Sequence, residues 1–123
     1  MTLWPGYINV PLYDSRGTQS AHGESAILSQ SYLRELKAFH RALGDVTRLR
    51  AVQILATEGE LSVSALVTRL NVSQPLMSWH LRRLTRAGIV TTERVGREVR
   101  CSFDRERFAE LQERSYRTLM NRS

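Results

Sequence analysis

The pattern of apolar and polar positions separates an irregular N-terminal arm from a body with clear periods. Residues 1–25 hold prolines and glycines and show no helical period. Their aromatic and aliphatic side chains are nevertheless too numerous for a plain solvated tail. We therefore expect an irregular N-terminal arm over residues 1–25 and a folded domain over residues 26–123. Whether the arm is ordered stays open at this point.

Helical periodicity predicts two helices at the start of the folded domain. Apolar residues recur every three or four positions over residues 26–43, which forms one apolar stripe. Gly44 ends this helix, and the side chain of Asp45 can cap a second helix that extends to about Gly59. The residues of this second helix that we expect to face the core are Leu49, Val52 and Leu55.

Two short helices joined by a tight turn are predicted next. Ser62 can cap the first of them, which ends at Leu70. Ser73 can cap the second, with Pro75 in its first turn, where the missing N–H is not needed. This second helix extends to about Ala87 and is followed by a glycine suited to a left-handed stop. Such a pair of helices is typical of a helix-turn-helix.

The period changes from helical to alternating over residues 89–103. β-branched residues lead into a Gly96-Arg97 turn, after which apolar residues, Cys101 among them, alternate with polar ones. Asp104 can then cap a last helix that extends to about Asn121. The resulting order is helix, helix, helix-turn-helix, hairpin and helix. It predicts a mainly α fold with one β-hairpin, which is a winged helix-turn-helix.

Composition narrows the class of protein. A chain of 123 residues suits one domain, and its single cysteine, Cys101, excludes an intrachain disulfide framework and a four-cysteine zinc site. No apolar run approaches 18 residues, and the chain does not open with a secretory signal, so we expect a cytoplasmic protein without a membrane span. The sequence offers no nucleophile–base pair and no glycine-rich phosphate loop, so we do not expect an enzyme.

The distribution of charge says more than its total. The net charge is +6, and 17 of the 18 basic residues are arginine. Between Arg69 and Arg100 there are seven arginines and two acids, which places +5 of the excess in 32 residues. This segment covers the predicted second helix of the helix-turn-helix and the hairpin. Concentrated positive charge on these elements favours binding to nucleic-acid phosphates.

Angular placement of the residues on the predicted helix over 74–87 separates two faces. Met77, Leu81 and Leu84 fall on the buried side, with His80 at its edge. The opposite side has short side chains at its start and arginines further on, as a helix entering the DNA major groove requires. With the hairpin arginines, the expected DNA-contacting residues are Ser73, Gln74, Pro75, Ser78, Trp79, His80, Arg82, Arg83, Arg86, Arg94 and Arg97. For His80, a bridge to a phosphate and a bridge to the neighbouring helix both stay open.

At this point the sequence resembles the ArsR/SmtB family of dimeric winged-helix repressors. The resemblance covers about residues 33–120 and is carried by Phe39 to Arg50, by Ser73-Gln74-Pro75-Leu76-Met77-Ser78-Trp79-His80-Leu81, by Ala87-Gly88-Ile89-Val90 and by the wing Arg94-Val95-Gly96-Arg97. It implies a bacterial or archaeal repressor that occludes a palindromic double-stranded operator. It also implies a homodimer formed through the first and last helices. The interface residues that follow are Leu28, Tyr32, Leu36, Phe108, Leu111 and Leu119.

The sequence departs from this family where its members bind metals. Soft-metal sensors carry a Cys-x-Cys where this chain has Ser62-Val63-Ser64, and a serine hydroxyl does not replace a thiolate for such metals. Zinc and cobalt sensors use the last helix. Here Asp104 and Glu106 stand in the first pair of ligand positions, while Arg117 and Met120 stand in the second. We therefore expect no metal or other cofactor, and the effector stays unknown.

Two alternatives remain beside the DNA-binding repressor. A lone cysteine can respond to oxidation by pairing between subunits or by capping, so Cys101 is a possible redox site. The other alternative is a protein-interaction module that uses Trp79 and the N-terminal arm. The sequence alone does not give the operator, the regulated genes, the effector or the direction of regulation.

Overall fold

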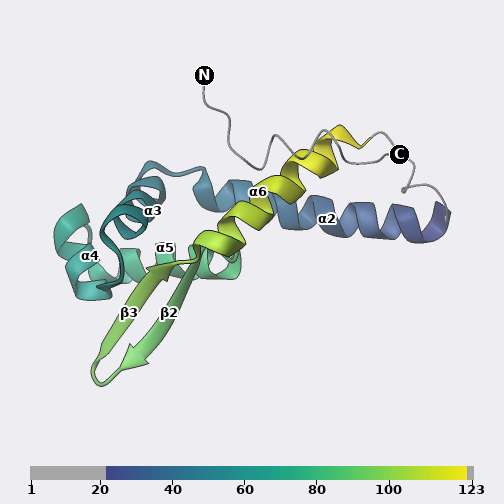
Figure 1. Ribbon diagram of the computed structural model, residues 1–123. Coiled ribbons are helices and arrows are strands. Elements are labelled where there is room, and N and C mark those ends of the chain that lie inside the picture. Colours follow the sequence, from purple (N-terminus) through teal and green to yellow (C-terminus); the bar gives the residue numbers. More distant parts are fainter. Residues whose placement is uncertain (1–21, 122–123) are drawn as a thin grey trace. The chain divides into compact units, whose positions relative to one another are not determined.

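A computed structural model describes the backbone of residues 22–121 and the side chains of residues 30–121. The elements in chain order are α2 (His22–Leu43), α3 (Val46–Glu58), β1 (Leu61–Ser62), α4 (Val63–Leu70), α5 (Gln74–Arg86), β2 (Val90–Val95), β3 (Glu98–Phe103) and α6 (Arg105–Met120) (Figure 1). Two compact units divide the chain: a central unit of residues 38–108 and a terminal unit that combines residues up to 37 with those from 109 onward.

The predicted helix starts agree with the observed caps. The Asp45 side chain accepts a hydrogen bond from Arg48 N at 3.0 Å, and Asp104 accepts one from Arg107 N at 3.0 Å. Each satisfies a backbone donor that the first helical turn leaves unpaired. The first helix differs from its prediction, because α2 begins at His22 rather than at residue 26. The rest of the arm lies outside the described residues.

The β-hairpin of β2 and β3, here called the wing, forms as predicted, with a third strand that the pattern did not reveal. Strands β2 and β3 pair antiparallel with Val95 opposite Glu98, so Gly96-Arg97 is a two-residue turn. Gly96 has φ 65°, a left-handed conformation that favours glycine at such turns. The short strand β1 pairs with the other side of β3, and the sheet order is β1-β3-β2. The wing is therefore anchored to the residues just before α4.

The central unit has an apolar core to which both its helices and its hairpin contribute. The largest fully buried side chains are Phe39, Leu55, Leu66, Met77, Leu84, Ile89, Val90 and Cys101. The predicted inward face of α3 is partly wrong: Leu49 is exposed and Val52 is half-buried, and the buried residues are Arg48, Ala51 and Leu55. Leu55 is buried as predicted, whereas Arg48 and Ala51 occupy the buried positions that the apolar pattern assigned to Leu49 and Val52.

The terminal unit pairs the first and last helices through charged side chains. Arg114 of α6 donates to Glu35 of α2 at 2.5 Å and to Glu110 at 3.3 Å. Large apolar side chains remain exposed on both helices of this unit: Tyr32, Leu33, Leu119 and Met120. Among the described residues, no helix is long and apolar enough to cross a membrane.

Candidate nucleic-acid interface

Helix α5 presents the two faces that the sequence predicted. Ser73, itself exposed, caps it by accepting a hydrogen bond from Leu76 N at 3.2 Å, and Pro75 stands in its first turn. Met77, Leu81 and Leu84 are buried in the core of the central unit. The expected contact residues of α5 that stay accessible, fully or partly, are Gln74, Pro75, Ser78, Trp79, Arg82, Arg83 and Arg86, and Leu76 and Thr85 are exposed as well. The accessible face therefore has Gln74, Pro75 and Ser78 at its start, together with the exposed Leu76, and arginines further along.

The expected DNA contact at His80 is corrected by the structure. His80 is only 4% exposed, and its Nδ1 lies 2.7 Å from Nη1 of Arg48, which is 7% exposed. Arg48 Nε also donates to the carbonyl oxygen of Ala42 at 2.7 Å. Because the guanidinium can only donate, His80 Nδ1 accepts and the ring proton resides on Nε2. His80 thus bridges α5 to the neighbouring helix and is not available to DNA.

Burial and charge together keep this histidine neutral. Burial lowers the pKa of His80 most strongly, Asp45 opposes the shift, and the Arg48 cation lowers it further. The backbone hydrogen bond from Arg48 in turn holds the pKa of Asp45 below its usual range. Sequence reasoning missed Arg48 altogether, because a charged residue gives no signal in an apolar pattern. The one local sign in the sequence was that Arg48 stands three residues after the capping Asp45, whose side chain accepts the hydrogen bond of Arg48 N.

Trp79 is held on the surface of α5 by neighbouring arginines. Its side chain is 40% exposed, and its ring centroid lies 4.7 Å from the Arg83 guanidinium carbon and 5.4 Å from that of Arg48. Cations over an indole ring are attracted by its electron-rich face. Arg83 is therefore engaged in holding Trp79, while the ring still offers part of its surface to a partner.

The arginines of the charged segment divide into paired and unpaired groups. Arg69 forms an ion pair with Glu58, and Arg100 pairs with Glu60 at 2.5 Å and with Glu98 at 3.0 Å. Among the side chains of residues 30–121, five arginines of this segment have no ion-pair or hydrogen-bond partner: Arg82, Arg83, Arg86, Arg94 and Arg97, of which Arg83 lies over the Trp79 ring. The unneutralised charge therefore lies on α5 and on the wing.

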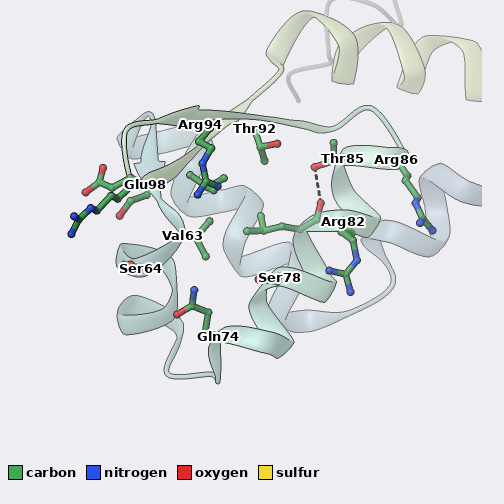
Figure 2. A pocket seen from close by; sticks show the side chains of 14 residues that line it. Val63, Ser64, Gln74, Ser78, Arg82, Thr85, Arg86, Thr92, Arg94 and Glu98 are labelled. Atoms are coloured by element: carbon green, nitrogen blue, oxygen red, sulfur yellow. Dashed lines mark hydrogen bonds between the residues drawn. The ribbon is translucent and has the colours of Figure 1, made fainter.

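A groove of about 540 Å³ lies between α5, the start of α4 and the wing. Figure 2 shows Arg94 and Thr92 pointing from the wing towards α4 and α5, with Arg82 and Arg86 on α5 towards the other end. Sequence reasoning did not anticipate the groove, because three separate segments form it. Its lining residues are Ser62, Val63, Ser64, Gln74, Ser78, Leu81, Arg82, Thr85, Arg86, Thr92, Arg94, Arg97, Glu98 and Val99.

The residues that would have to hold a family-type metal do not fit one. Ser62 is the cap of α4, and its hydroxyl oxygen accepts a hydrogen bond from Ala65 N at 3.1 Å. Arg117 donates to Glu113 at 2.8 Å and brings a cation to a ligand position. Among the side chains of residues 30–121, no three histidine, cysteine or acidic groups gather as a metal site would need. Hydroxyl and guanidinium groups are poor ligands for the soft and borderline metals concerned.

Cys101 does not have the surroundings of a redox sensor. Its side chain is fully buried in the core beneath the sheet. Burial raises the pKa of the Cys101 thiol to about 11, with an opposing effect of Arg100. Reactive thiols are accessible and ionised, and this one is neither. The structure therefore does not support the interpretation of Cys101 as a redox site.

The expected dimer residues do not all lie on an accessible surface. Tyr32 and Leu119 are exposed, at 42% and 60%, and Leu36 is half-buried. Leu111 is only 3% exposed within the single chain, so its side chain has little surface left for a partner. Phe108 is half-buried, and its ring packs within the central unit on Phe39 and Phe103, with centroids 5.5 and 5.2 Å apart. The side chain of Leu28 lies outside the described residues.

The cap–turn–cap geometry of α4 and α5, followed by a hairpin wing, defines a winged helix-turn-helix protein. The model of the family described as bacterial regulatory protein, arsR family, matches residues 45–92. An ArsR-like transcriptional regulator from Rhodococcus sp. RHA1 is 32% identical with a TM-score of 0.61, over 69% of this chain and 79% of that one. The chain belongs to the arsR family.

Further relatives share the same core. The HTH-type transcriptional repressor SmtB of Mycobacterium tuberculosis is 48% identical over 59 residues, which are 48% of this chain and 43% of that protein. A homodimeric winged helix-turn-helix DNA-binding domain from Mycobacterium bovis has a TM-score of 0.60 at 26% identity, over 76% of this chain and 81% of that one. The chain spans about half the length of the curated relatives it matches.

Proposed function

We propose that this protein is a sequence-specific DNA-binding transcriptional repressor and not an enzyme. The observation that carries the proposal is the placement of unpaired charge: Arg82, Arg86, Arg94 and Arg97 lie on the two elements that a winged helix brings to DNA. In the same segment, Arg69 and Arg100 are neutralised by acids of the chain itself, and Arg83 lies over the Trp79 ring. Membership of a family of bacterial regulatory proteins supports the same function.

In the proposed complex, α5 lies in the major groove with its N-terminal end towards the bases. Gln74 and Ser78 near the N-terminal end can form hydrogen bonds to base edges. Arg82 and Arg86 bind flanking phosphates. The wing arginines Arg94 and Arg97 hold the neighbouring backbone or enter the minor groove. His80 has no contact with DNA and fixes the helix from behind.

We further propose that two copies bind together as a homodimer. The exposed apolar side chains of the terminal unit, which include Tyr32, Leu33, Leu119 and Met120, support an interface on α2 and α6. A homodimer of such domains places two recognition helices on a palindromic operator. The related domain from Mycobacterium bovis is described as homodimeric. Repression then results from occupying the operator, in the cytoplasm of a bacterium or archaeon.

The proposal is tested by selecting DNA from a random-sequence duplex pool with the purified full-length chain. We expect an inverted repeat to be enriched, with half-sites about one helical turn apart. A promoter carrying that repeat is then transcribed in vitro, and we expect less transcript as the protein is added. Failure to enrich any sequence contradicts specific binding. If a sequence is enriched but the protein increases transcription, repression is contradicted while sequence-specific DNA binding stands.

A further inference from the structure

The groove between α5 and the wing is more than a phosphate-binding surface. Part of its lining is apolar, contributed by Val63, Leu81 and Val99 from three different elements. Contacts to DNA phosphates are made by cations and hydrogen-bond donors, so the apolar part of the lining offers a contact of a different kind. A concave site of about 540 Å³ that combines an apolar part with charged and polar groups has the size of a small-molecule site.

The positive charge of the groove favours a negatively charged ligand. Four arginines line it, and in the described part of the chain none of them has an ion-pair partner. The lining has one acid, Glu98, which already pairs with Arg100 at 3.0 Å. Hydroxyl groups of Ser78 and Thr92 add donors beside the arginines. Arginine matches planar or tetrahedral oxyanions with paired N–H groups, so this combination favours an anion.

We propose that this groove binds a small organic anion, with an apolar body against Val63 and Val99 and an acidic group held by Arg94. In the view of Figure 2, Arg94 extends from the wing above Val63, and both residues line the groove. Arg94, which would hold the acid, is also proposed to contact DNA. The anion therefore competes with DNA. This competition rests on the proposed function, whereas binding of the anion alone does not.

Binding is tested first without DNA, with 1-naphthyl phosphate as the probe. It combines a bicyclic apolar body with a phosphate, and inorganic phosphate and 1-naphthol supply each part separately. Calorimetric titration of the full-length chain should give saturable binding by 1-naphthyl phosphate. Each separate part should bind at least tenfold more weakly. Equal binding by inorganic phosphate would overturn the combined site and leave only a phosphate-binding surface.

Variants locate the site. Arg94→Gln and Val63→Ser should each weaken 1-naphthyl phosphate binding at least tenfold. Arg50→Gln, which removes the same charge from an exposed position of α3 outside the groove, should change affinity less than twofold. Far-ultraviolet circular dichroism confirms that each variant is folded. An unchanged affinity in Arg94→Gln, or an equal loss in Arg50→Gln, overturns the proposal.

Competition is tested last, by fluorescence anisotropy of a labelled duplex. We expect 1-naphthyl phosphate to displace the duplex with an inhibition constant within threefold of its directly measured Kd. If the protein binds the duplex and the probe together, the competition is overturned while the site stands. If the protein binds the probe and no duplex, the proposed function fails while the anion site stands. The two failures are therefore distinguishable.

Discussion

At the scale of single residues, the most informative contact is the buried one between Arg48 and His80. A guanidinium donates to a histidine that burial keeps neutral, with Asp45 as the nearby acid. The pair lies directly behind Trp79, whose ring centroid is 5.2 Å from that of His80. The polar contact thus sets how α5 sits against α3, a role that hydropathy gives no means of predicting.

The pH dependence of stability should report this contact. Because the folded-state pKa of His80 is lowered, the unfolded chain takes up the proton first as the pH falls below about 6.5. The free energy of unfolding, measured in urea, should therefore decrease from pH 7 to pH 5. His80→Gln should flatten that decrease, whereas His40→Gln, at an exposed position, should keep it. If the free energy of unfolding of His80→Gln decreased more steeply than that of the wild-type chain, a lowered pKa of His80 in the folded protein would be contradicted.

The thiol of Cys101 should be unreactive in the folded protein. A buried thiol with a pKa of about 11 is neither accessible nor ionised at neutral pH. Reaction with an aromatic disulfide reagent should be at least a hundredfold slower in buffer than in 6 M guanidinium chloride. DNA affinity should not change after treatment with hydrogen peroxide. Rapid modification of the native protein, together with weaker DNA binding, would restore the thiol-responsive interpretation.

At the scale of elements, the features that depend on residues close together in the sequence, such as helix caps, could be predicted. The caps at Asp45, Ser62, Ser73 and Asp104 are side-chain hydrogen bonds over three residues, so their pattern is visible in a short window. Strand β1 was missed because two residues have no detectable period, and its pairing with β3 joins segments that are distant in the sequence. The groove was missed for the same reason, since distant segments assemble it.

The unpaired arginines of α5 predict how the affinity for DNA varies with salt. Arg82→Ala and Arg86→Ala should each weaken duplex binding and reduce the slope of log affinity against log salt by about 0.9 for each phosphate that the variant no longer neutralises. Arg69→Ala is the matched control, because Arg69 already pairs with Glu58. Its slope should stay unchanged. An equally reduced slope in Arg69→Ala would show that total charge, and not the α5 surface, governs binding.

At the scale of the whole molecule, the proposed dimer interface on α2 and α6 can be tested at one of its exposed apolar residues. Leu119→Glu should shift the chain from dimer to monomer in light scattering after gel filtration, because it buries a charge in the proposed interface. Val46→Glu, at a more exposed apolar position on α3, should leave the dimer intact. A monomeric wild-type chain at 50 μM, or a dimeric Leu119→Glu, would contradict an interface at these helices.

The central claim is that α5 and the wing read a DNA sequence, and the most direct measurement compares two duplexes. Fluorescence anisotropy should give the Kd of the full-length chain for a selected inverted repeat and for a scrambled duplex of identical composition, in the same salt. Specific recognition typically exceeds non-specific binding by about a thousandfold or more. We expect a ratio of at least that size, reduced to below tenfold by Gln74→Ala combined with Ser78→Ala. Equal affinities for the two duplexes in the wild-type chain would contradict the claim.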